Sequence, residues 1–111
     1  MKNVRLSHDA KEDLKGIRNY IRDELDNPEG AKNVSDRIIR RIRQLEQFPM
    51  MGAALSSVMA PETDYRFLVS GNYLIFYRVN EATVYVDRIL HGKRDYLKIL
   101  FKNATEEETN A

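Results

Sequence analysis

Residues 65–90, which read YRFLVSGNYLIFYRVNEATVYVDRIL, hold three runs typical of β-strands. The runs are Tyr65 to Ser70, Tyr73 to Val79 and Thr83 to Leu90, and they are rich in valine, isoleucine, tyrosine and phenylalanine. Short polar segments that suit turns separate them, namely Gly71-Asn72 and Asn80-Glu81-Ala82. The stretch therefore predicts an antiparallel meander of three strands.

Two helical segments precede these strands. Ser7 suits the N-cap of the first helix, and the apolar residues that follow recur at spacings of three and four, as one stripe. The stripe consists of Ala10, Leu14, Ile17, Ile21 and Leu25, and we expect it to lie in the core. Asn27-Pro28 then begins a second helix, which Phe48-Pro49 ends. Its apolar residues are Ala31, Val34, Ile38, Ile42 and Leu45. We expect the two helices to form an antiparallel hairpin.

The order of these elements defines the expected fold class. Asn3 to Leu6 can add an N-terminal edge strand, so the order is β-α-α-β-β-β and the fold is α+β. The helical hairpin should pack on one face of the sheet and leave the other face available. Residues 49–64 predict a loop with room for a short helical turn, and residues 91–102 predict coil or a short helix.

Composition limits the classes of protein. The 111 residues suit one domain, which we expect over residues 1–102, followed by a flexible acidic tail over residues 103–111. No cysteine is present, which excludes disulfides and thiolate chemistry, and we expect neither a metal nor a cofactor. Because no apolar run approaches about 20 residues and no signal peptide is evident, we expect a cytoplasmic protein without membrane contact.

The net charge of +1 is an average over unlike segments. The tail holds Glu106, Glu107 and Glu108, so residues 1–102 carry +1 plus 3, which is +4. Most of this excess lies in residues 32–43 and 88–102. Either stretch can meet phosphate or an acidic partner, and the first can equally be a solvated helix face.

The candidate site residues lie late in the chain. No Gly-rich phosphate loop, nucleophile elbow or clear pair of catalytic carboxylates is present. Instead, a polar and basic set stands out in this part of the chain: Arg66, Tyr77, Arg78, Arg88, His91, Lys93, Arg94 and Tyr96. Strand alternation places Arg66 on the face of Leu68, and Arg78 on the face of Phe76 and Leu74. A structural alternative is that the arginines pair with Asp64, Asp87 or Asp95.

The late part of the chain resembles RelE/ParE toxins. The resemblance rests on residues 73–79, YLIFYRV, and on residues 87–95, DRILHGKRD. The first helix, with Asp13-Leu14 and Tyr20-Ile21, and the segment from Leu45 to Gly52 are also similar to that family. The resemblance covers residues 3 to about 100. It implies a bacterial toxin of a type II toxin-antitoxin system that inhibits growth and is neutralised by a cognate antitoxin.

The resemblance implies two alternative activities. RelE-like members cut ribosome-bound messenger RNA without a metal, using basic residues and a tyrosine to stabilise the scissile phosphate and to move protons. In this sequence the matching catalytic set is Arg66, His91, Arg94 and Tyr96. Leu68 and Leu74, however, replace a lysine and an arginine of that set. One such contact can be worth about 3 to 4 kcal/mol, so these replacements weaken the nuclease reading.

ParE-like members poison DNA gyrase and need no catalytic set, and the strand YLIFYRV is closer to theirs. Under that reading the basic surface and the helical hairpin engage gyrase, and the residues that we expect to bind nucleic acid or the target are Arg78, Arg88, Lys93 and Lys98. His91 keeps the nuclease alternative open, because a histidine can act as acid or base near neutral pH. A third alternative is a non-toxic member that only joins its antitoxin in binding operator DNA and regulating its own expression.

Overall fold

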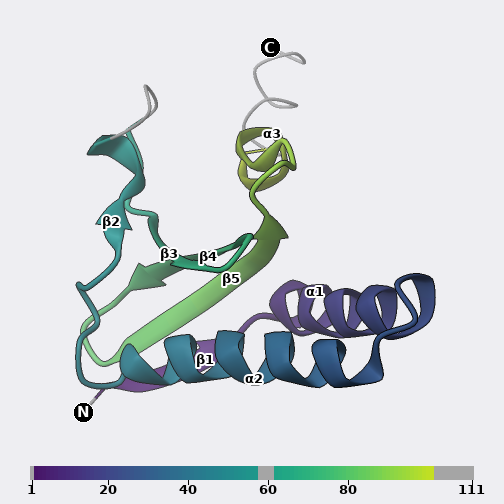
Figure 1. Cartoon of the computed structure of the whole chain (residues 1–111). Helices are drawn as coiled ribbons and strands as arrows, with labels where there is room; N and C mark the ends of the chain where they lie inside the picture. Colours follow the sequence, from purple (N-terminus) through teal and green to yellow (C-terminus); the bar gives the residue numbers. More distant parts are fainter. Residues whose placement is uncertain (1, 58–61, 102–111) are drawn as a thin grey trace.

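The strands of the protein lie in one sheet, in the spatial order β1, β5, β4, β3, β2 (Figure 1). The computed structural model describes residues 2–57 and 62–101, so the acidic tail predicted over residues 103–111 lies outside the described residues. The predicted meander is confirmed: β3 (Arg66–Ser70), β4 (Tyr73–Val79) and β5 (Thr83–His91) pair antiparallel. The α+β fold class is thereby confirmed.

Two short strands form the edges of the sheet. The predicted edge strand β1 (Asn3–Leu6) pairs parallel with β5, so that Asn3 lies opposite Thr83 and Leu6 lies opposite Val86. The other edge is β2 (Ala53–Ala54), which the sequence analysis placed in a loop. A 3-10 turn, Leu55–Ser57, follows it, in agreement with the predicted helical turn.

The two long helices begin where their capping residues predict. Ser7 Oγ accepts a hydrogen bond from Ala10 N at 3.0 Å and caps α1 (His8–Asn19). Asn27 Oδ1 accepts one from Gly30 N at 2.9 Å and caps α2 (Pro28–Gln44), which has Pro28 in its first turn. The helices run in opposite directions beneath the sheet as the predicted hairpin (Figure 1).

One residue of the predicted apolar stripe on α1 is not buried. The helix continues into a π-helical turn, Tyr20–Glu24, and Leu25 N donates to Tyr20 O at 3.2 Å, five residues back. This wider turn rotates Leu25 away from Ile21, and the Leu25 side chain is 56% exposed. The prediction that Leu25 belongs to the core is therefore wrong.

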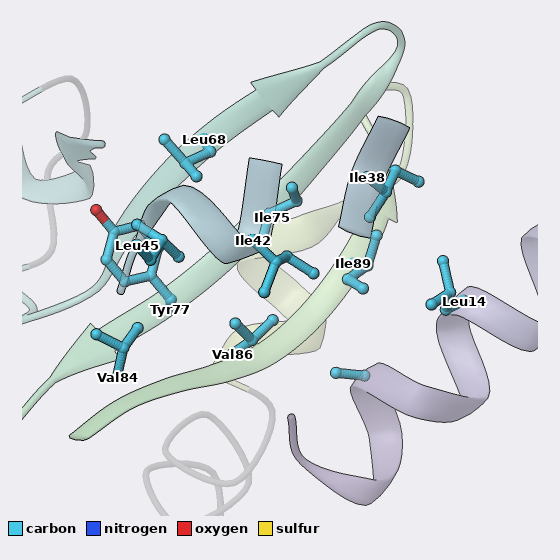
Figure 2. Packing of buried hydrophobic residues seen from close by; sticks show 11 residues of the cluster. Leu14, Ile38, Ile42, Leu45, Leu68, Ile75, Tyr77, Val84, Val86 and Ile89 are labelled. Carbon is cyan, nitrogen blue, oxygen red and sulfur yellow. The ribbon is translucent and has the colours of Figure 1, made fainter. Parts of the chain in front are cut away.

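The main core lies between the helical hairpin and one face of the sheet (Figure 2). It joins Leu14 and Ile38 of the helices to alternate strand residues such as Ile75 and Val86. A second, smaller cluster covers the opposite face, where Phe76 and Leu90 pack under α3 (Tyr96–Leu100). The hairpin leaves this second face uncovered as expected, but the face is available only in part, because the apolar residues of α3 bury some of it.

Candidate functional site

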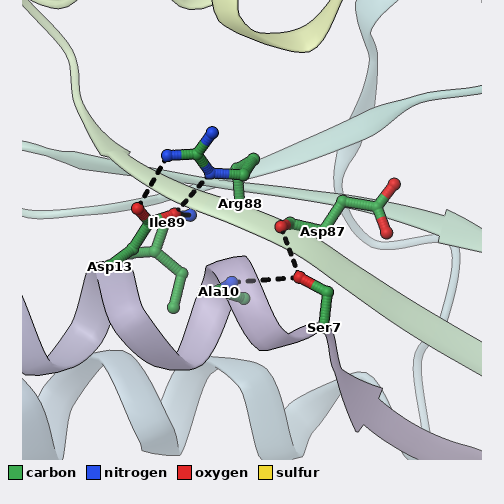
Figure 3. Close-up of polar contacts among 6 residues, drawn as sticks. All are labelled: Ser7, Ala10, Asp13, Asp87, Arg88 and Ile89. Atoms are coloured by element: carbon green, nitrogen blue, oxygen red, sulfur yellow. Dashed lines mark hydrogen bonds and ion pairs between the residues drawn. The ribbon is translucent and has the colours of Figure 1, made fainter.

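The last part of β5 is held against α1 by side chains of that helix. The strand β1 ends opposite Val86, so the edge of β5 beyond Val86 has no neighbouring strand. Ser7 N donates to Val86 O at 2.9 Å, and Ser7 Oγ donates to Asp87 O at 2.7 Å. Further along, Asp13 Oδ2 accepts from Ile89 N at 2.9 Å (Figure 3). These bonds give hydrogen-bond partners to the backbone groups on the unpaired edge of β5. They also fix the position of the strand residues that lead to His91.

Arg88 is part of the same network. Its Nε and Nη2 donate to the Asp13 carboxylate at 2.7 and 2.8 Å, in a bidentate pair (Figure 3). The hydrogen bond with Asp13 raises the pKa of Arg88 above its ordinary value, against the opposing effect of burial. The expectation that Arg88 pairs with Asp64, Asp87 or Asp95 is wrong, since its partner is a helix residue.

Arg78 lies on the outer face of the sheet and pairs with Asp87, as one of the sequence alternatives has it. Its Nε lies 3.0 Å from Asp87 Oδ2, and its guanidinium lies 5.2 Å from the ring centre of Tyr65. Burial of Tyr65, reinforced by a hydrogen bond with Asp87, raises the pKa of that phenol to about 12. Arg78 is thus occupied within the fold while half of its side chain remains exposed.

Arg66 holds the segment that precedes β2. Its Nε donates to Gly52 O at 3.0 Å, and its Nη2 donates to Met50 O at 3.1 Å. It also lies far from His91 along the sheet, because Arg66 pairs with Tyr77 whereas His91 pairs with Tyr73. Four strand residues amount to about 13 Å. Arg66 and His91 are therefore not brought together.

Tyr96 packs against the sheet rather than standing free. Its ring centre lies 5.3 Å from that of Phe76, at the start of α3. Three cations of this region are exposed and make no side-chain hydrogen bond or ion pair with any residue that the structure describes: Lys93, Arg94 and Lys98.

His91 and Arg94 share a pocket between α1 and the ends of β4 and β5. The pocket has a volume of about 510 Å³, and Tyr20, Tyr73 and Glu12 also line it. His91 Nδ1 accepts from Lys93 N at 3.1 Å, which leaves Nε2 as the donor of the neutral ring. The rings of His91 and Tyr73 are nearly perpendicular, with their centres 5.4 Å apart. The site can bind an acceptor group beside aromatic rings.

Sequence reasoning missed three residues of this region: Asp13, Tyr20 and Tyr73. Asp13 lies one residue before buried Leu14 and three after buried Ala10, so helical periodicity turns it toward the sheet. That spacing was the available signal. Tyr20 lines the pocket from the π-helical turn, and no local sequence pattern predicts that turn.

Comparison with known proteins identifies the family of this chain. Residues 4–96 match the family model described as the ParE toxin of the type II toxin-antitoxin system, parDE. The chain therefore belongs to the ParE toxin family, and its partner is an antitoxin. It is also similar in structure to a chain of the chromosomal ParDE TA system from P. aeruginosa, with a TM-score of 0.68 and 22% sequence identity over 82% of this chain and 96% of that chain. No protein with a curated description matches it.

Within residues 2–57 and 62–101, no helix is long and apolar enough to cross a membrane. The same residues hold no group of three or more histidine, aspartate or glutamate side chains placed to bind a metal ion.

Proposed function

We propose that this toxin inhibits growth by binding DNA gyrase, and that it does so without acting as a ribonuclease. One observation carries the proposal: at two positions where RelE-like nucleases hold phosphate-binding cations, this chain has leucines whose side chains pack in the hydrophobic clusters. Leu68 is 3% exposed and belongs to the main core, and Leu74 packs with the cluster under α3. No cation at either position replaces the lost contacts to a phosphate.

The remaining members of the proposed catalytic set are dispersed. Arg66 is bound to backbone carbonyls, and Tyr96 packs on Phe76. Only His91 and Arg94 share a pocket. This pair is the observation that favours the alternative of messenger cleavage. For the gyrase proposal, the same pocket with exposed Lys93 and Lys98 is the surface that contacts the target. Arg88 supports this surface through its pair with Asp13, whereas Arg78 lies at the opposite end of β4.

The test adds the purified protein to gyrase with supercoiled plasmid and ATP, and separately to a translating ribosome system. We expect trapped gyrase cleavage complexes, seen as linear plasmid after protein digestion, and intact messenger. Replacing Lys93 and Arg94 together by glutamine should reduce the linear product, whereas Arg5→Gln, on the exposed side of β1, should not. Codon-positioned messenger cuts that vanish in Arg94→Ala would overturn the proposal. Expression without growth arrest would instead favour the operator-binding alternative.

A further inference from the structure

A continuous strip of basic side chains follows the outer side of the helical hairpin, away from the pocket of His91. The groove between α1 and α2 is lined on one wall by Lys15, Arg18 and Arg22 of α1. Lys32 lines the opposite wall, from α2. A second hollow follows along α2 and is lined by Arg40 and Arg43. Asp36 lines both hollows, so they form one surface, which we call the hairpin strip.

The charge of the hairpin strip is concentrated. Six cations line it against the single carboxylate Asp36, although the whole chain carries only +1. Two of the six are paired: Lys32 Nζ lies 2.9 Å from Asp36 Oδ2, and Arg22 Nε lies 2.9 Å from Asp23 Oδ1. The other four form no side-chain hydrogen bond or ion pair in the part of the chain that the structure describes: Lys15, Arg18, Arg40 and Arg43.

The spacing of the cations suits a phosphate chain. On α1, residues 15, 18 and 22 follow spacings of three and four and face one side. On α2, residues 32, 36, 40 and 43 do the same. Residues 32 to 43 cover about 16 Å of helix. One DNA strand presents a phosphate every 3.4 Å of its axis, which gives about five phosphates over that length.

The composition of the strip favours nucleic acid over a protein partner. Stable protein interfaces are built around buried aromatic or large apolar anchors. Half-buried Ile39 lines the second hollow, whereas the exposed large apolar residues of the described chain line neither hollow: Tyr20, Leu25, Phe48, Met50, Met51, Val69 and Tyr85. The floor of the groove holds Ala31 and Ser35, which are small and buried. A surface dominated by cations, with no exposed large apolar side chain, suits contact with a phosphate backbone.

We infer that the hairpin strip binds the phosphate backbone of double-stranded DNA directly and without sequence preference. This contact goes beyond the proposed binding of gyrase and does not depend on it. It gives the toxin a second attachment, on the opposite side of the hairpin from the pocket of His91 and Arg94.

The test measures fluorescence anisotropy of a labelled 20-base-pair duplex of mixed sequence with the purified chain over a range of NaCl concentrations. We expect a Kd on the order of 10⁻⁵ M and a logarithmic salt slope of about −4. Combined replacement of Lys15, Arg18, Arg40 and Arg43 by glutamine should weaken binding at least tenfold and bring the slope close to zero. The single variant Arg18→Gln should reduce the slope by about 1, whereas the control Arg5→Gln should leave it unchanged. Thermal unfolding checks that each variant is folded.

Three results would overturn the inference. The first is absence of duplex binding at low salt, and the second is an equal loss in Arg5→Gln and Arg18→Gln. The third is tighter binding of poly-L-glutamate, or of a single-stranded RNA of the same length, than of the duplex, which would assign the strip to an acidic protein or to RNA. Because gyrase is absent from this assay, a negative result would disprove DNA binding by the hairpin strip without bearing on the proposal that the toxin binds gyrase.

Discussion

The carboxylate of Asp13 binds the guanidinium of Arg88 in a bidentate pair and, through the same Oδ2, the backbone of the next residue. The two residues are 75 positions apart in the chain, so this contact joins the first helix to the last strand. Asp13 also lines the pocket that holds His91.

Removing the Asp13 carboxylate should destabilise the fold. In Asp13→Ala, Arg88 and the Ile89 N–H lose their acceptor in a part-buried place, and we expect a loss of about 2 to 3 kcal/mol in the free energy of unfolding. Urea denaturation measures this loss. Arg22→Gln breaks the exposed pair with Asp23 and serves as the control, which should unfold like the parent protein. Equal stability of the two variants would contradict the role given to Asp13.

Two glycines should respond to alanine in opposite directions. A Cβ on Gly52 would lie 2.6 Å from both Phe67 O and Tyr77 Oη, so Gly52→Ala should cost about 2 kcal/mol of stability. A Cβ on Gly16 meets nothing within 4 Å in the middle of α1, so Gly16→Ala should add about 0.5 to 1 kcal/mol. Thermal unfolding of both variants checks the signs, and a destabilising Gly16→Ala would show that this prediction is wrong.

Removing the buried hydroxyl of Tyr77 should lower the stability of the fold. It is buried and accepts a hydrogen bond from Gly52 N at 2.9 Å. Tyr77→Phe leaves that N–H without a partner, and we expect a loss of about 1 to 2 kcal/mol. Tyr85→Phe, on an exposed ring of the neighbouring strand, is the matched control and should unfold like the parent protein.

Tyr65 predicts how stability changes at high pH. Its pKa is raised from 10.0 to about 12, first by burial and then by Asp87, so the fold favours the neutral phenol. This contribution is complete below pH 10 and is lost as the pH rises toward 12. The free energy of unfolding should therefore fall more steeply over this interval in the parent protein than in Tyr65→Phe. Parallel curves for the two proteins would contradict the assignment.

Variants of His91 distinguish a toxin that acts by binding its target from one that acts as a nuclease. Asparagine can accept the Lys93 N–H through Oδ1 as His91 does through Nδ1, but it cannot exchange a proton near neutral pH. Under the gyrase proposal, His91→Asn should retain growth inhibition, while His91→Ala should lose about 1 kcal/mol of stability with the hydrogen bond. Growth inhibition that disappears in His91→Asn, with folding intact, would support the nuclease alternative.

Most of the fold was predictable because its signals are local. Ser7 and Asn27 cap helices, and Gly71, with φ at +58°, forms the turn between β3 and β4. What escaped prediction depends on distant or subtle contacts. The strand β2 is two residues long and exists only by pairing with β3. The covering of the second sheet face depends on the docking of α3, whose five residues carry no long periodicity.

The candidate site was less predictable than the fold. The sequence separates exposed cations from apolar strand residues, but it does not give the partners of an arginine. Arg78 pairs with Asp87 on the adjacent strand, and Arg66 donates hydrogen bonds to backbone carbonyls. Arg88 pairs with a helix residue 75 positions earlier in the chain. Such pairings are fixed by tertiary packing, so a basic residue in the sequence identifies a candidate without stating whether its charge is free.

The parallel pairing of β1 with β5 also has a consequence for the timing of synthesis. Asn3 lies opposite Thr83, so the first strand cannot enter the sheet until the ribosome has translated about three quarters of the chain. At typical elongation rates the first strand waits roughly 4 to 16 s for its neighbour. The nascent chain therefore lacks its complete sheet during most of its own translation, and that interval is available to its antitoxin.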